Sequence, residues 1–214
     1  MGKTIVTYET FHGSAKKIAL IIAEKLGTKC INIDTPFEVE DLKEFDNIIL
    51  VFNFRGPYTA QLTKLYLNRV KEQFKNKNMI LVGEGLFSEK EFPIVAQEIQ
   101  TIAPSKNFAK FFVTGQLRVD TLFPEEKVLL AKFSELTGME IKDMGELDLV
   151  KANMVASEIG MLIASEAYQI DVLEEDEAES IEWICDVCGY VHKGQTPPAT
   201  CPLCGVPSSH FYQK

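Results

Sequence analysis

The amino-acid sequence predicts an α/β protein: a doubly wound domain with a five-stranded parallel sheet, followed by a small metal-binding domain. Two observations predict this arrangement. Through residues 1–170, short apolar runs alternate with longer segments of helical spacing, as in βαβ units. Near the carboxyl end, four of the five cysteines form two C-x-x-C pairs, a pattern typical of a tetrahedral metal site. A chain of 214 residues is long enough for one ordinary domain and a small second one.

Five short runs rich in β-branched and aromatic residues predict the strands of the sheet. They span residues 4–8, 28–33, 47–52, 79–82 and 109–114. Because most of these runs are continuously apolar, we expect parallel strands that are covered by helices on both faces. Segments of helical spacing separate them, and in the first of these Ile18, Ile22 and Leu26 share one face. The helices are expected at residues 13–26, 59–74, 90–101, 125–136 and 147–169.

The turn after the first strand is a candidate ligand site, since open parallel sheets bind ligands at the carboxyl ends of their strands. The hydroxyl groups of Thr10 and Ser14 and successive backbone N–H groups lead there into a helix start, which suits a phosphate group. The spacing matches neither a P-loop nor the G-x-G-x-x-G fingerprint. Taken alone, the turn could equally be a plain helix cap at Ser14.

In this setting the turn resembles the FMN-phosphate loop of the flavodoxin family. Thr10, Gly13 and Ser14 match the hydroxyl-rich loop of that family, and residues 17–19 continue into its first helix. The resemblance implies a flavodoxin-like sheet of order 2-1-3-4-5, with the phosphate of FMN held by this loop. The residues implied are Thr10, Phe11, His12, Gly13, Ser14 and Ala15.

Three residues of this loop depart from the family pattern. Ala15 stands where the family has Thr or Ser, and Phe11 and His12 replace smaller hydroxyl residues. We therefore expect backbone N–H groups to hold the phosphate, with His12 adding a hydrogen bond or a charge. FMN is expected to be held more weakly than in other flavodoxins.

The loops after the third and fourth strands correspond to those that clasp the isoalloxazine ring in flavodoxins. The cofactor-binding residues implied there are Asn53, Phe54, Arg55, Gly56, Tyr58, Glu84, Gly85, Leu86 and Phe87. The aromatic side chains could stack on the ring or could simply pack in the core. A cation at Arg55 would stabilise the reduced, anionic flavin, so Arg55→Ala is expected to lower the reduction potential of the flavin.

The segment that follows the fifth strand narrows the resemblance. Residues 114–123 and the helix at 125–136 resemble a subgroup of flavodoxin-like proteins that includes the flavodoxin-type protoporphyrinogen oxidases, and Arg55 matches an arginine of that subgroup. This likeness keeps a second function open, in which the chain is a flavin-dependent oxidase or dehydrogenase that acts on an organic substrate.

The two cysteine pairs predict the metal centre of the small domain. Cys185 and Cys188 form the first pair, and Cys201 and Cys204 form the second, with twelve residues between the two pairs. A glycine follows each pair and lets the backbone turn so that N–H groups point at sulfur, which stabilises thiolate ligands. By spacing alone the metal could be iron or zinc.

The residues around these pairs resemble the rubredoxin domain found at the carboxyl end of rubrerythrins. The matching residues outside the ligands are Trp183, Gly189, Tyr190, Val191, His192, Pro198, Pro202, Leu203, Gly205, Pro207 and Phe211. The resemblance implies one iron ion that cycles between ferric and ferrous. Cys188 and Cys204 are expected to be the more exposed ligands and the exit point for electrons. The alternative is a zinc ribbon that only folds the tail, in a non-redox binding module.

Acidic residues mark the boundary between the two domains. The net charge is −9, and residues 152–192 contain ten acidic residues and no Lys or Arg. We expect domains at 1–170 and 182–214, joined by an acidic linker at 171–181 that is either a solvated spacer or a docking patch for a basic redox partner. The chain lacks a basic stripe and a long apolar run, so neither nucleic acid nor membrane is an expected partner. A reducing cytoplasm suits the thiolates, and Cys30 is expected to be an inert core thiol.

These expectations combine into an electron-transfer function. FMN accepts two electrons and can pass them on singly, whereas a four-cysteine iron site carries one. A reductase or hydride donor would load the flavin, the iron would take the electrons, and a terminal oxidoreductase would accept them, by family analogy in oxygen or peroxide defence of an anaerobe. A rubrerythrin peroxidase or flavodiiron centre is excluded, because the three histidines, His12, His192 and His210, are too few to ligate such a centre. The sequence leaves the oligomeric state open.

Overall fold

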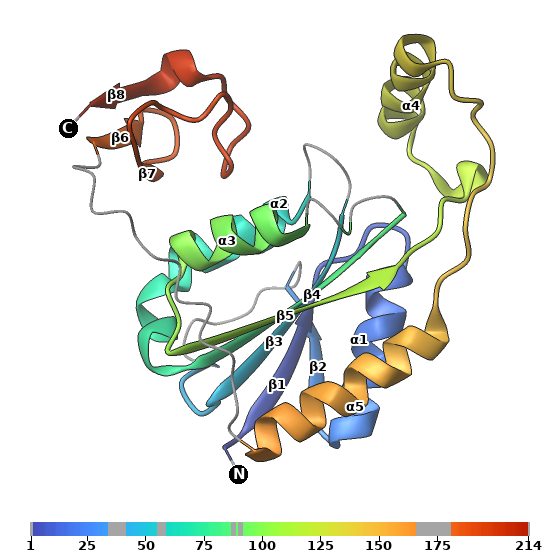
Figure 1. Ribbon diagram of the computed structural model, residues 1–214, viewed down its shortest axis with the longest axis vertical. Helices are drawn as coiled ribbons and strands as arrows, with labels where there is room; N and C mark the ends of the chain where they lie inside the picture. The colour runs from blue at the N-terminus through green and yellow to red at the C-terminus, as the bar shows by residue number, and fades with distance from the viewer. Residues whose placement is uncertain are drawn as a thin grey trace.

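A computed structural model describes residues 2–33, 42–54, 59–86, 89, 92–165 and 181–213. The first part of the chain forms a five-stranded sheet with helices on both faces (Figure 1). Its strands are β1 (Thr4–Tyr8), β2 (Lys29–Asn32), β3 (Asn47–Asn53), β4 (Asn78–Gly85) and β5 (Asn107–Thr114). Its helices are α1 (Ser14–Leu26), α2 (Gln61–Val70), the 3-10 helix η3 (Lys71–Asn76), α3 (Phe92–Ile102), the 3-10 helix η4 (Val119–Thr121), α4 (Pro124–Thr137) and α5 (Leu149–Ser165).

The strand order is β2-β1-β3-β4-β5 and every pairing is parallel, which confirms the predicted topology. The chain winds outward from β1 to β2 and then, on the other side of β1, through β3, β4 and β5. The switch in winding lies between β1 and β3, so the loops after these strands open at the same edge of the sheet. This is the place where ligands of open α/β sheets bind.

β4 is longer than the sequence indicates. Its apolar run ends at Val82, but pairing continues on both sides through Gly83 and Glu84, and on the β5 side through Gly85. Glu84 pairs with Asn53 of β3 and with Val113 of β5. Two flanking strands therefore hold in strand conformation a Gly-Glu-Gly sequence with low intrinsic β-propensity.

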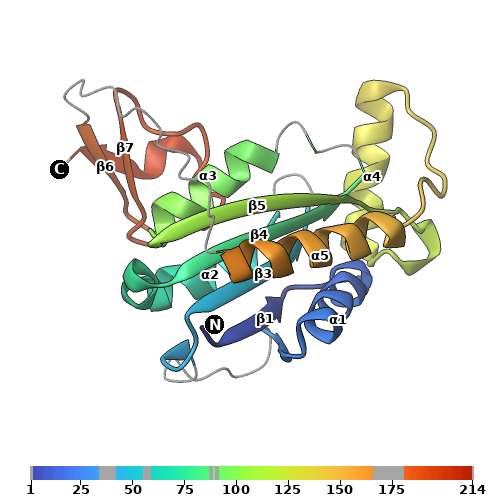
Figure 2. The same ribbon diagram turned by 60° about the horizontal axis from the view of Figure 1, so that its bottom comes forward.

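The helices form two layers around the sheet. α1 and α5 cover one face, and α2 and α3 cover the other (Figure 2). Side chains alternate between the two faces along each strand, as β1 illustrates: Val6 joins the α1–α5 side and Ile5 the α2–α3 side. Both are fully buried. Among the described residues, no helix combines the length and the apolar character that a membrane span requires.

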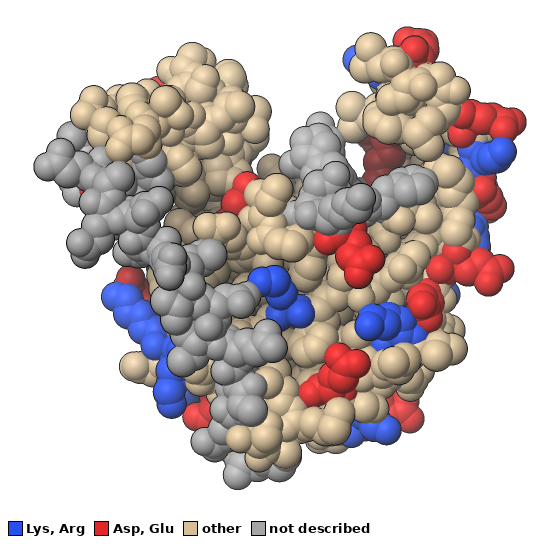
Figure 3. Space-filling model, viewed as in Figure 1, with Lys and Arg blue, Asp and Glu red and all other residues tan. Residues whose placement is uncertain are grey.

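Between β5 and α5 the chain leaves the body of the domain and forms an arm that carries α4 (Figure 1). An antiparallel bridge between Leu117 and Met144 closes the base of this arm, with N–H···O distances of 2.8 and 3.1 Å. No residue of α4 is buried. On the face in Figure 3, acidic side chains gather around α4.

The small domain is a three-stranded antiparallel sheet of order β7-β6-β8, built from β6 (Ile181–Cys185), β7 (Val191–Gly194) and β8 (Phe211–Gln213), with the 3-10 helix η5 (Ser208–His210) before β8. It lies beside α3 in both ribbon views (Figures 1 and 2). One cluster of buried apolar side chains continues from the α2–α3 face into the small domain, where it includes Tyr190, Leu203 and Phe211. The predicted linker, 171–181, lies outside the described residues except for Ile181, which begins β6.

Candidate functional site

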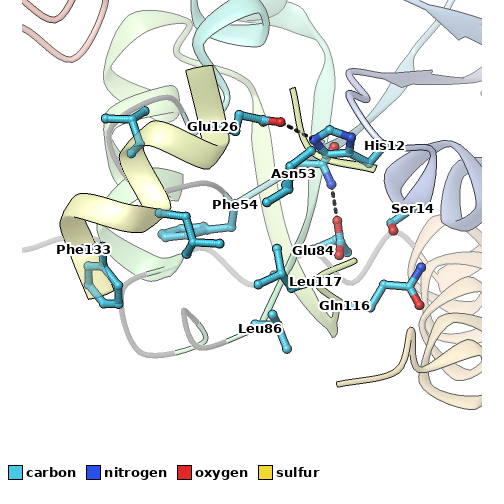
Figure 4. A pocket seen from close by; sticks show the side chains of 14 residues that line it. His12, Ser14, Asn53, Phe54, Glu84, Leu86, Gln116, Leu117, Glu126 and Phe133 are labelled. Carbon is cyan, nitrogen blue, oxygen red and sulfur yellow. Dashed lines mark hydrogen bonds and ion pairs between the residues drawn. The ribbon is translucent and has the colours of Figure 1, made fainter. Parts of the chain in front are cut away.

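A cavity of about 450 Å³ opens at the carboxyl ends of the central strands, where the topology predicts a ligand (Figure 4). One wall comes from the loops after β1, β3 and β4, and the opposite wall comes from the arm that carries α4. The lining residues are His12, Ser14, Asn53, Phe54, Glu84, Gly85, Leu86, Gln116, Leu117, Leu122, Glu126, Leu129, Leu130 and Phe133. The cavity is of the size that holds small-molecule cofactors, and it is mostly apolar with a few convergent polar groups.

The loop after β1 brings the amino end of α1 to this cavity. Thr10 Oγ1 accepts a hydrogen bond from the N–H of Gly13 at 3.0 Å, which closes the turn. Gly13 has a φ of 86°, a left-handed conformation that favours glycine, and precedes the first helical residue. Ser14 is therefore not a helix cap; it begins α1, and its side chain lines the cavity. The first N–H groups of α1 have no partner inside the helix, so this end can bind an anion such as a phosphate.

Glu84 is the buried carboxyl group of the cavity. Its side chain is 3% exposed, Oε2 accepts a hydrogen bond from Asn53 Nδ2, and the backbone N–H of Gln116 also donates to the carboxyl group. Burial raises the pKa of Glu84 from 4.5 to about 7, although these two hydrogen bonds favour the charged form. A Cβ atom added to Gly115 would lie only 1.8 Å from Oε1, so the close approach of β5 to this carboxyl group requires glycine.

α4 supplies an apolar wall opposite the strands, with Leu129, Leu130 and Phe133 facing the cavity. The arm is tied to the loop after β1 by a 2.8 Å contact between His12 Nε2 and Glu126 Oε2 (Figure 4). Glu126 also accepts the N–H of Phe123 at 2.9 Å and so caps its own helix. None of the predicted site residues lies on this wall. The sequence feature that could have predicted it is the apolar stripe of α4, a helix whose side chains are not buried in the core of the domain.

The predicted cofactor residues fall into three groups. Seven line the cavity: His12, Ser14, Asn53, Phe54, Glu84, Gly85 and Leu86. Thr10, Phe11 and Gly13 belong to the same loop without lining the cavity, and Ala15 is fully buried beneath it. Arg55, Gly56, Tyr58 and Phe87 lie outside the described residues.

The cavity fits FMN in the chemistry of its groups. The start of α1 offers N–H donors and the positive end of a helix dipole to a phosphate. Phe54 and the apolar residues of the arm offer a dry surface to a flat ring, at the other side of the same cavity. Because Gly85 has no side chain, its backbone can lie close to Phe54; a Cβ there would be 2.9 Å from Cβ of Phe54.

The four cysteines of the small domain converge on one point. All four Sγ atoms lie within 4.8 Å of one another. The distance from Cys185 Sγ to Cys204 Sγ is 3.7 Å, and that from Cys188 Sγ to Cys201 Sγ is 3.5 Å. Four sulfur ligands at about 2.3 Å from one tetrahedral ion lie about 3.8 Å apart. The geometry therefore fits a single tetrahedral metal ion, and it suits iron and zinc alike.

Each cysteine pair forms the same tight turn. The N–H of Gly189 donates to the carbonyl of Cys185 at 2.9 Å, and that of Gly205 donates to Cys201 at 2.8 Å. Both glycines have positive φ, 72° and 75°. The turn aims backbone N–H groups at sulfur, as the sequence predicts. Burial opposes ionisation of the Cys185 thiol, but the N–H groups of Cys188 and Val187 bring its pKa below the usual value.

The ligands differ in exposure as predicted. Cys185 and Cys201 are buried, whereas Cys188 and Cys204 are partly exposed and pack against the apolar cluster shared with the first domain. The fifth cysteine, Cys30, lies on β2, and burial raises the pKa of its thiol to about 11, which keeps it protonated.

Two family profiles match this chain. The profile described as "Flavodoxin domain" matches residues 5–142, more than half of the sequence, and "Rubrerythrin, rubredoxin-like domain" matches residues 183–212. Among curated relatives, a putative rubrerythrin of Methanocaldococcus jannaschii is 47% identical over 34 residues, which are 16% of this chain and 17% of that protein. The rubrerythrin of Nitratidesulfovibrio vulgaris is 46% identical over 33 residues, 15% of this chain and 17% of that protein. The chain thus spans less than a fifth of these relatives.

Solved structures that resemble part of this chain include two flavodoxins. An archaeal flavodoxin has a TM-score of 0.44 and 15% identity, covering 64% of this chain and 99% of its own. Flavodoxin 1 of Bacillus cereus has a TM-score of 0.41 and 15% identity, with the same coverage of 64% and 99%.

Proposed function

Because the chain belongs to the flavodoxin-domain family and ends in a rubrerythrin-type rubredoxin-like domain, we propose that it is an electron-transfer protein that joins an FMN site to a mononuclear iron site. The observation that carries the proposal is that one chain holds both a cavity at the switch point of the sheet and a cluster of four thiols with tetrahedral spacing. A structural zinc ribbon would account for the second site alone, without the first.

In this function the first domain binds and shields the cofactor. FMN supplies two-electron chemistry with release of single electrons, and iron supplies a one-electron relay. The amino end of α1, with Ser14 and His12, would bind the phosphate. Phe54 on one side and Leu129 and Phe133 on the other would exclude water from the ring.

In the small domain, Cys188 and Cys204 are the partly exposed ligands and form the proposed exit for electrons. The proposed partners are a reductase or hydride donor on the flavin side and a terminal oxidoreductase on the iron side. Oxygen or peroxide defence in an anaerobe and a reducing cytoplasm are part of this proposal, by analogy with the domains involved.

Stepwise reduction of the anaerobically purified protein, followed by visible absorption, tests this function. We expect yellow flavin bands and red ferric–thiolate bands that bleach in sequence. Cys201→Ser should remove the ferric–thiolate bands and leave the flavin bands, whereas Cys30→Ser should leave both. A colourless protein that contains zinc would refute the proposal, and iron bands without flavin would refute the account of the cavity.

A second candidate function is a flavin-dependent oxidase or dehydrogenase for an organic substrate. The observation that favours it is the wall formed by α4, which gives the cavity more apolar lining than a ring-binding loop alone. Turnover with protoporphyrinogen or with reduced nicotinamide would support it. Flavin reduction and reoxidation through protein partners alone would favour the carrier.

A further inference from the structure

One buried carboxyl group lines the cavity in the described part of the chain, and the electron-transfer function proposed above gives it no chemical role. Glu84 lies near the end of β4, paired on both sides, with Asn53 on one flank and Val113 on the other. It is 3% exposed and lines the cavity with the rest of the described wall. A buried carboxylate is costly unless it is neutralised or well hydrogen-bonded, so a group at this position needs an explanation.

Among the residues that the structure describes, the surroundings of Glu84 offer hydrogen bonds but no balancing cation. Asn53 Nδ2 and the backbone N–H of Gln116 donate to the carboxyl group. The other charged side chains that line the cavity in the described part of the chain are His12 and Glu126, and they pair with each other at 2.8 Å. Arg55 lies outside the described residues. Hydrogen bonds without a counter-ion leave the charged and neutral forms close in free energy, as the pKa of about 7 also indicates.

We propose that Glu84 is the proton-exchanging group of the cofactor cavity: its carboxylate takes up one solvent proton when the bound cofactor gains negative charge, and releases it on reoxidation. This inference rests on the proposed function, because it requires a redox cofactor in the cavity. The electrons come from an external reductase or hydride donor. The proton that binds Glu84 is additional to any proton that the cofactor itself takes up.

The physical basis is repulsion between two negative charges in a dry site. Added negative charge within the cavity raises the free energy of the Glu84 carboxylate, because low local dielectric strengthens the interaction. Protonation removes that repulsion. Since the starting pKa lies near neutrality, a modest shift changes the charge of the group at physiological pH. Glu84 would thus set how the affinity of the cofactor for electrons depends on pH.

Two measurements on the FMN-loaded protein test this. In the wild type, the two-electron midpoint potential should fall with pH more steeply than in Glu84→Gln, by about one additional proton per electron pair around neutral pH. A reduced-minus-oxidised infrared difference spectrum should show a protonated-carboxyl band in the wild type that is absent in the variant. Glu158→Gln, on α5 and outside the cavity, is the matched control and should behave as wild type in both measurements.

Further variants keep the test decisive if Glu84→Gln folds poorly. Asn53→Ala removes a hydrogen bond that favours the charged carboxyl group, so the pH at which the slope changes should move upward. The infrared band of the wild type needs no variant. Equal slopes in wild type and Glu84→Gln, or a difference spectrum without a carboxyl band, would overturn the role of Glu84 while leaving the electron-transfer function intact. Failure of the purified protein to bind added FMN would overturn both.

Discussion

Glu84 links the chemistry of the cavity to the stability of the first domain. A carboxyl group whose pKa is higher in the folded than in the unfolded chain binds more protons when folded, over the pH range between the two values. For Glu84 that range runs from the ordinary value of 4.5 to about 7. Folding stability from this group is therefore greatest at acid pH and is lost as the pH rises through this range.

The first prediction follows from this loss of folding stability with rising pH. In FMN-free protein, Glu84→Gln should gain stability relative to the wild type as pH rises from about 4.5 to about 7, by about 3 kcal/mol in total. Denaturant unfolding at a series of pH values measures the difference. The neutral amide of Gln accepts these hydrogen bonds less strongly than a carboxylate, but that difference does not vary with pH and leaves the pH dependence of the unfolding free energy intact. A difference that is flat with pH would contradict the raised pKa.

Gly115 carries the second prediction. A Cβ at this position would lie 1.8 Å from Glu84 Oε1 and 3.1 Å from Cα of Gly85, so Gly115→Ala must displace the carboxyl group or the strand. We expect destabilisation of about 1–3 kcal/mol, the cost of overpacking. Combining it with Glu84→Ala should reduce that cost, and a double-mutant cycle measures the coupling.

Gly160 on α5 provides the matched control. An added Cβ there meets only Leu26 Cδ2 at 3.4 Å, an ordinary contact. Because Ala is the better helix former, Gly160→Ala should stabilise the protein by up to about 1 kcal/mol. Destabilisation of equal size by both substitutions would mean that crowding at Glu84 is not the cause.

At the scale of elements, α4 is the unusual part of the first domain. The described structure buries none of its residues, and the helix is tied to the body through His12 and Glu126. Its apolar residues therefore contribute little to the folding of the FMN-free protein. Leu129, Leu130 and Phe133 face the cavity, where a bound ring would cover them.

The third prediction tests whether α4 serves cofactor binding and not folding stability. Phe133→Ala should weaken FMN binding about tenfold, as expected for about 1.4 kcal/mol of lost apolar contact, with little change in the unfolding free energy of the FMN-free protein. Fluorescence quenching of FMN measures the affinity. Leu136→Ala, in the same helix but 87% exposed and outside the lining of the cavity, should bind FMN as the wild type does. Equal affinity in all three proteins would show that α4 does not cover the cofactor.

The sequence predicts these elements far better than it predicts the cavity. All five parallel strands and the helices between them follow from apolar runs and helical periodicity, which are local signals. Glu84 lies in a Gly-Glu-Gly stretch that has no such signal, and it is strand because β3 and β5 pair with it. Its contacts with Asn53 and Gln116 join residues more than thirty positions apart. The four-cysteine site could be predicted in full, because its ligands and its glycines share one short motif.

At the scale of the whole molecule, the small domain packs beside α3. Glu98 of α3 lies close enough to favour the charged form of His192, whose pKa burial otherwise lowers. Glu98 also pairs with Lys64 of α2 at 2.9 Å. The pKa of His192 in the small domain therefore depends on contact with α3 of the first domain.

The fourth prediction uses that contact. Glu98→Gln should lower the pKa of His192 further, since the variant removes the negative charge that supports the imidazolium. Proton NMR of the zinc-substituted, diamagnetic protein follows the titration. Glu158→Gln, on α5 at the opposite face of the sheet, should leave the pKa of His192 unchanged. If Glu98→Gln also leaves it unchanged, the two domains do not stay packed in solution.

The position of the four ligands along the chain has a consequence for biosynthesis. The strands and helices of the first domain lie between Thr4 and Ser165, and the four cysteines lie between Cys185 and Cys204. The sheet and its helices can therefore form without metal, because none of them supplies a ligand. In a cell short of iron, this separation yields chains with a complete sheet and an empty cysteine cluster. The iron content of freshly made protein would then record the metal supply during growth, independently of how well the rest of the chain has folded.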